Sequence, residues 1–307
     1  MNRNFVLILV FVVNILCRSF SQSAEIDRYF AGISGENNPV VPESFFLQKN
    51  EQRVQKALLH YCADTFLMVR KNAFLLLASQ GLKSGQAEIR RKTVTALLAG
   101  YNDADAGIRN ICRRKLLLFF QDDFDNAAHD SVCMMLRKSG HPGKYLLLLA
   151  GLTGNTNTIA EIKTLWHNGT LTPEEKWYAL ISLVRCGEKT YEDLLLGSVN
   201  IITVNDDFVY EVLPGLLFSC SRKIYDYLFS LVFEGKNYCS CGNPDSESLV
   251  LCSMKILDNL SEHVEGFPVE KDNGGDLMGS RREIMEKTNE WFAENKSAYR
   301  IIKRGFK

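Results

Sequence analysis

The chain has 307 residues, of which 46% are hydrophobic and 23% are charged, and a chain of this length can bury roughly 75% of its unfolded surface without a metal or a disulfide framework. Lys plus Arg equals Asp plus Glu at 36 each. The chain therefore lacks the overall basic excess with which proteins bind nucleic-acid phosphates, and we expect no nucleic-acid partner. We interpret a local basic run at Arg109, Arg113, Arg114 and Lys115 as a solvated helix face.

The first segment has the pattern of a secretory signal peptide. Arg3 supplies a positive charge, residues 5–16 are rich in apolar side chains, and residues 21–24 are small enough for cleavage. This apolar run is shorter than the ~20 residues that a helix needs to cross a bilayer, and charges interrupt every later run. The sequence therefore predicts a signal peptide over residues 1–23, an exported protein in the periplasm or the medium, and no integral membrane span.

The mature N-terminus has two interpretations. Simple cleavage would leave Ala24 or Glu25 first. In the alternative, Cys17 would be lipidated, and its acyl chain would tether the protein to the cell envelope without embedding it. Leu16 stands where a lipoprotein cleavage site has a small residue, so we favour simple cleavage.

Apolar residues recur at i, i+3, i+4 and i+7 along most of the chain, which predicts helices. The first examples are Ile26 to Ile33 and Val54 to Tyr61. Three segments then place a β-branched residue and an arginine near a helix start, at intervals of 20 and 19 residues: Val69-Arg70, Ile89-Arg90 and Ile108-Arg109. An interval of about twenty residues is one helix with its turn, so a two-helix unit spans about forty, which is the period of HEAT and armadillo arrays.

These pairs, with Ala73 and Ala96 after two of them, make residues 50–140 resemble a HEAT-repeat or armadillo-like α-solenoid. The resemblance implies an all-α fold in which stacked antiparallel helix pairs form an α-α superhelix, and a surface that binds a protein or peptide, usually without catalysis. Later helices keep the spacing but lose the paired residues. Residues 290–299 are similar to the end of uncharacterised exported bacterial proteins of this helical type. We expect a single helical-repeat domain over residues 24–307.

The turns between the early helices contain acidic residues. The segment from Asn102 to Gly107 is superficially like a calcium loop, but it lacks the required oxygen ligands, so we interpret it as an interhelical turn with an Asp N-cap. Asp122, Asp123 and Asp125 occupy another turn, where we expect solvated carboxylates.

Two helix starts are marked by capping boxes. Thr172 is followed by Pro173 and Glu175, with Gly187 at the expected end of that helix, and Ser280 is followed by Glu283. Residues 198–204 are β-branched but have no partner strand, so we interpret them as a linker between helices.

The only dense cysteine cluster lies in the last third of the chain. Cys239 and Cys241 occupy a stretch that we expect to be a loop because of Gly242 and Pro244, and Cys252 falls in the next predicted helix. We favour a disulfide from Cys239 or Cys241 to Cys252, which an oxidising compartment would permit. Free thiols, or a zinc site that adds His263, stay open as alternatives.

A long loop near residues 264–280 precedes the last helix, and such loops are commonly functional or plain linkers. The chain contains no catalytic, metal or cofactor motif that we can identify. We therefore expect a non-enzymatic interaction or scaffold module that binds a protein or peptide, with no cofactor. An exported hydrolase or lyase on a helical scaffold is the alternative.

Overall fold

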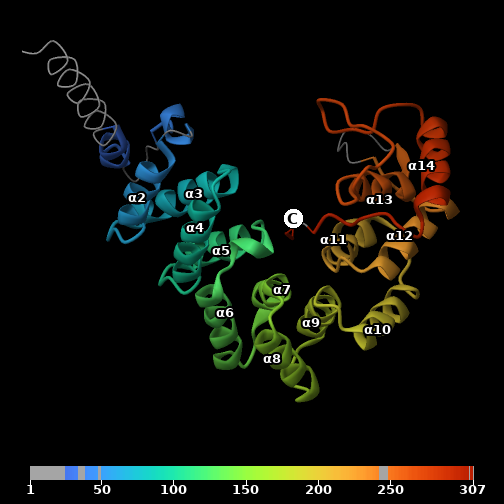
Figure 1. The fold of residues 1–307 in the computed structure, drawn as a ribbon, viewed down its shortest axis with the longest axis horizontal. Coiled ribbons are helices and arrows are strands. Elements are labelled where there is room, and N and C mark those ends of the chain that lie inside the picture. The colour runs from blue at the N-terminus through green and yellow to red at the C-terminus, as the bar shows by residue number, and fades with distance from the viewer. Residues whose placement is uncertain (1–24, 34–38, 48–49, 242–247, 304, 307) are drawn as a thin grey trace, which may run out of the picture. The chain divides into compact units, whose positions relative to one another are not determined.

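The computed structural model describes residues 25–33, 39–47, 50–241, 248–303 and 305–306 (Figure 1). The predicted signal peptide, with Cys17, and Ala24 lie outside the described residues. The predicted all-α fold is confirmed: helices follow one another along the described chain, and the only sheet there has two short strands. No helix in the described segments is long and apolar enough to cross a membrane.

The chain divides into two compact units, Met1–Phe119 and Phe120–Lys307, and each is described by itself. The single repeat domain expected over residues 24–307 stays a prediction. In the first unit, residues 25–31 are helical. The elements that follow are η1 (Glu43–Phe46), α2 (Glu51–Tyr61), α3 (Leu67–Lys83), α4 (Ala87–Gly100) and α5 (Ala106–Leu116).

The second unit begins with a short helical turn and continues through ten further helical elements and a hairpin in its described residues. In chain order these are η3 (Gln121–Asp123), α6 (Asn126–Lys138), α7 (Gly143–Thr153), α8 (Thr156–His167), α9 (Pro173–Arg185), α10 (Lys189–Val199), η4 (Phe208–Val212), α11 (Leu213–Phe218), α12 (Arg222–Glu234), β1 (Tyr238–Ser240), β2 (Leu249–Leu251), α13 (Cys252–Ser261) and α14 (Arg281–Asn295). In both units, each helix packs mainly on near neighbours in sequence.

The three repeated arginines make the same kind of hydrogen bond in the first unit. Each is the fourth residue of its helix, and its guanidinium donates to the backbone carbonyl six residues earlier, in the preceding turn. The donor–acceptor distances are 2.7 Å from Arg70 to Asp64, 3.1 Å from Arg90 to Ser84 and 2.8 Å from Arg109 to Asp103. We call these the arginine-capped turns.

The rest of each arginine-capped turn repeats as well. The side chains of Asp64, Ser84 and Asp103 each accept the N–H of the residue two positions later, a local hydrogen bond typical of Asx and Ser turns. The β-branched residue before each arginine, at positions 69, 89 and 108, is buried. The Val-Arg and Ile-Arg pairs thus fix a helix start from both sides, with one side chain in the core and the other on the turn.

Arg70 also connects two turns that are distant in sequence. Its Nε and Nη2 donate to the two carboxylate oxygens of Asp103 at 3.0 and 3.3 Å. Partial burial opposes ionisation of Asp103, but the hydrogen bonds from Arg70 and from the backbone N–H of Asp105 outweigh it and lower the pKa of the carboxyl group. The Asp103 carboxylate therefore remains ionised at neutral pH.

The second unit opens with a turn of similar design that the sequence analysis missed. His129 is the fourth residue of α6, twenty residues after Arg109, and one of its ring nitrogens lies 3.0 Å from the carbonyl oxygen of Phe124. Asp125 caps α6 by accepting the N–H of Ala128, as Asp105 caps α5. A histidine replaces the arginine, so a search for repeated arginines does not find this turn.

The acidic turn at 122–125 differs in part from expectation. We expected three solvated carboxylates, but Asp123 is only 1% exposed. Its carboxylate accepts the backbone N–H of Phe120 at 3.2 Å and so caps η3. The prediction was wrong for Asp123 because it treated the carboxylate as a free charge instead of a partner for an otherwise unpaired backbone donor.

The two predicted capping boxes are confirmed. Thr172 and Glu175 exchange hydrogen bonds at the start of α9, and Ser280 and Glu283 do so at the start of α14. Gly187 follows α9 with φ of 85°, the left-handed conformation that glycine adopts at low cost.

Replacing Arg70 with Gln should lower the free energy of unfolding by about 1.5–3 kcal/mol, the range for hydrogen bonds to charged groups, because the carbonyl of Asp64 and the carboxylate of Asp103 both lose their donor. Chemical denaturation followed by helical circular dichroism measures this loss. The deficit should narrow as the pH falls below the ordinary carboxyl pKa of 3.8, since protonation of Asp103 weakens the same pair in the wild type.

Lys92→Gln is the matched control for that variant. It removes another cation from an ion pair, with Glu88 at 2.7 Å, but this pair lies on an exposed helix surface, where water screens it. Its unfolding free energy should stay close to the wild-type value, and equal losses in the two variants would contradict a special role for the arginine-capped turns.

Candidate functional site

The second unit contains a cleft of about 480 Å³, within the size range of small-molecule and side-chain binding pockets. Its walls come from five segments that are separated in sequence: η4, the β1–β2 hairpin, α13, the loop near 264–280 and the start of α14. The lining residues are Val209, Tyr210, Cys241, Val250, Met254, Lys255, Asp258, Asn259, Asp276, Leu277, Gly279, Arg281 and Ile284.

The first wall is a π-helical turn that leads into α11. Pro214 has no N–H to donate to the carbonyl of Tyr210, and its ring would clash there, so a regular α-helix cannot run through this position. The N–H of Leu213 instead bonds to the carbonyl of Phe208, five residues earlier. The wider turn buries Phe208 and Val209 and leaves Tyr210 56% exposed, at the edge of the cleft.

Lys255 joins this turn to α13. Its Nζ lies 2.9 Å from the hydroxyl oxygen of Tyr210 and 3.1 Å from Oδ1 of Asp206, and it also lies 4.7 Å from the centre of the Tyr210 ring. Burial disfavours the charged amine, but the hydrogen bonds to Tyr210 and Asp206 outweigh it and raise the pKa of Lys255. Lys255 is therefore a fixed cation and not a candidate base.

Asp206 connects the same wall to the hairpin. Its Oδ2 accepts the backbone N–H of Ser240 at 2.9 Å. This bond, together with the one from Lys255, lowers the pKa of Asp206. The carboxylate thus ties β1 directly to the segment that precedes η4, and Lys255 ties the same carboxylate to α13.

The predicted cysteine cluster forms the base of the hairpin. Cys239 and Cys252 are joined by a disulfide with a Cα–Cα distance of 5.0 Å, and both are buried. Cys241, two residues after Cys239, is not part of this disulfide and lies on the lining of the cleft. Cys252 is the first residue of α13, so the disulfide attaches β1 to the start of that helix.

Two features of this region differ from the sequence interpretation. Residues 238–240, which we expected to be a loop, pair in antiparallel register with residues 249–251. The zinc alternative is not supported either, because the sulfur atoms of Cys239 and Cys252 are bonded to each other, and Nδ1 of His263 contacts the carbonyl oxygen of Asn259. Across the described segments, no group of His, Cys, Asp and Glu residues is placed to hold a metal ion.

The loop near 264–280 contains no helix, but its interactions hold it against α13. Nζ of Lys271 lies 2.7 Å from Oδ1 of Asp258 and 3.1 Å from Oε1 of Glu262. Further along, Asp272 Oδ1 accepts the N–H groups of Gly274 and Asp276. These bonds fold the loop back on itself and place Asp276 and Leu277 on the lining of the cleft.

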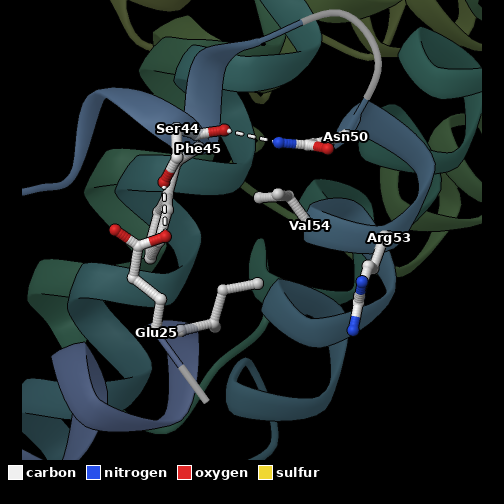
Figure 2. Close-up of a pocket in the computed structure, with 7 residues that line it drawn as sticks. Glu25, Ser44, Phe45, Asn50, Arg53 and Val54 are labelled. Atoms are coloured by element: carbon white, nitrogen blue, oxygen red, sulfur yellow. Dashed lines mark hydrogen bonds between the residues drawn. The ribbon is translucent and has the colours of Figure 1, made fainter. Parts of the chain in front are cut away.

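The repeated pairs Val69-Arg70, Ile89-Arg90 and Ile108-Arg109 all lie in the first unit, where they act in the arginine-capped turns. That unit also has a small cavity around Glu25, Ser44 and Val54, which Figure 2 shows. Ser44 donates to Glu25 at 2.8 Å and accepts from Asn50 at 3.3 Å, and the cavity leaves no space for a water molecule. It is a packed junction and not a binding site.

Comparison with known proteins gives no match: no protein family model fits the chain, and no curated protein is significantly similar to it. The interpretation of the cleft therefore depends on its own residues.

The double variant Cys239→Ala/Cys252→Ala should lose about 3 kcal/mol of stability, the effect expected when a cross-link that closes a loop of this length no longer restricts the unfolded chain. Thermal unfolding with and without a reducing agent measures it. Reductant should lower the melting temperature of the wild type and leave that of the double variant unchanged. A wild type insensitive to reductant under unfolding conditions would argue against the disulfide.

Proposed function

We propose that this protein is an exported, non-enzymatic interaction module that binds a peptide or a segment of another protein in the cleft of its second unit. The observation that carries this proposal is the chemistry of the cleft walls. Val209, Val250, Met254, Leu277 and Ile284 supply apolar surface from five segments, which suits apolar side chains of a bound segment.

The charged groups of the cleft also support a binding function. Lys255 is held by Asp206 and Tyr210, and Asp258 is held by Lys271. These paired charges hold the walls of the cleft in place and offer polar contacts at its rim. A catalytic acid or base would instead need a pKa adjusted to proton transfer. The hydrolase or lyase alternative stays a prediction.

Two further features support export and binding. The Cys239–Cys252 disulfide suits an oxidising compartment, in agreement with the predicted signal peptide. The resemblance of residues 50–140 to HEAT and armadillo arrays implies a chain whose surface serves to bind partners.

Met254→Glu tests the binding proposal. Short peptides selected from a random display library against the full chain should bind in the cleft, and the introduced carboxylate should weaken them by about ten-fold or more, because it buries a charge on an apolar wall. Fluorescence anisotropy with labelled peptides measures the affinity.

Met134→Glu is the matched control, because Met134 is a 53% exposed methionine on another helix of the same unit. It should leave the affinity unchanged. The proposal would be contradicted if no peptide could be selected, or if Met254→Glu and Met134→Glu bound the selected peptides equally well.

The export proposal has its own measurement. Mass spectrometry of the protein recovered from cells should find a mature chain that starts at Ala24 or Glu25. A chain that starts at an acylated Cys17 would replace the secreted form with an envelope-tethered one, and a chain that retains residues 1–23 would contradict export by cleavage.

A further inference from the structure

The chain after α14 crosses the second unit in an extended path. In Figure 1 it runs from α14 past α12 and α11. Its first part is firmly attached: the N–H of Ile302 donates to the carbonyl of His263 at 2.8 Å, and the carbonyl of Arg300 accepts from Glu265 at 2.9 Å. Tyr299 is only 3% exposed.

The end of this path is held differently. The ring of Phe306 lies edge-on to Phe218 of α11, with 5.6 Å between ring centres and an interplanar angle of 74°. Nζ of Lys144 lies 5.3 Å from the centre of the Phe306 ring and 4.8 Å from that of Tyr178 on α9. One ammonium group therefore contacts two rings, and Phe306 is one of them.

The surface beneath Phe306 is formed by contacts of its own. The guanidinium of Arg185 lies 4.1 Å from the centre of the Phe218 ring and donates to the carbonyl of Phe218 at 2.6 Å. Phe218 and Tyr178 are both buried between helices. We call Lys144, Tyr178, Arg185 and Phe218 the ring-and-cation surface. Its residues belong to α7, α9 and α11.

Phe306 is in contact with the surface through its ring. Lys303, Gly305 and Phe306 make none of the hydrogen bonds found in the described part of the chain, in contrast to residues 299–302. A residue that is held by ring contacts opens locally more readily than residues that are held by main-chain hydrogen bonds. The ring-and-cation surface is therefore covered by a ring whose residue makes no hydrogen bond among the described residues.

We propose that the ring-and-cation surface is a recognition site for an extended polypeptide segment that carries an aromatic side chain, and that Phe306 occupies it as an internal competitor. The ring contacts define the ligand chemistry: the ammonium of Lys144 favours the face of an aromatic ring, and Phe218 accepts the ring edge-on. An aliphatic side chain would meet neither requirement. This site is separate from the cleft and does not depend on the proposed function.

The test uses the full-length chain and a fluorescently labelled peptide with the sequence of residues 298–307. Phe306→Ala removes the internal competitor, so this variant should bind the peptide at least about ten-fold more tightly than the wild type. The same peptide with Phe replaced by Ala should show no binding to either protein. Adding Lys144→Gln to the Phe306→Ala variant should weaken binding of the original peptide several-fold.

Circular dichroism and thermal unfolding establish that each variant is folded before it is titrated. Met254→Glu, placed in the cleft, should leave binding of this peptide unchanged, so the two proposals succeed or fail separately. The inference is overturned if the Phe306→Ala variant does not bind the peptide, if it binds no more tightly than the wild type, or if the peptide that lacks Phe binds equally well.

Discussion

The hydrogen bond from an arginine side chain back to the carbonyl of the preceding turn is the interaction on which the first unit depends. A turn between packed helices leaves backbone carbonyls near apolar surface, where an unpaired polar group is costly. Arg70, Arg90 and Arg109 each satisfy such a carbonyl. The guanidinium of Arg70 has further N–H donors, which bind the carboxylate of Asp103. The backbone carbonyl of the same Asp103 accepts from Arg109. The turn before α3 is thus joined to the turn before α5 as well as to its own helix, and this bond fixes the relative positions of α3 and α5.

The sequence predicted features that depend on a few adjacent residues. The capping boxes at Thr172 and Ser280 need only the correct side chains three residues apart, and the repeated spacing of Arg70, Arg90 and Arg109 is visible in the printed chain. The hydrogen-bond partners of these arginines could not be predicted, because the group that a long side chain reaches depends on how the turn bends. His129 was missed because it contacts the carbonyl of the preceding turn with an imidazole ring instead of a guanidinium group.

The cleft could not be predicted, because its lining residues come from five segments that only tertiary packing brings together. Three of these segments also depart from regular helix stacking. Pro214 forces a π-helical turn, two three-residue strands pair because a disulfide holds their base, and the loop around Lys271 folds on α13. Strands this short carry almost no periodic signal. Departures from local regularity are where function is expected.

The same departures make the cleft largely preformed. The loop near 264–280 is attached at its start through the pairing of Val264 with Ile301, in its middle through Lys271, and at its end through the capping box of Ser280. A cluster of rings that includes Phe229, Trp291 and Tyr299 in turn holds α14 against α12. Ordering a mobile loop would reduce the affinity for a ligand, because its entropy would be lost on binding. In this chain that entropy is lost during folding, so the walls of the cleft would already be in place for a segment bound as we propose.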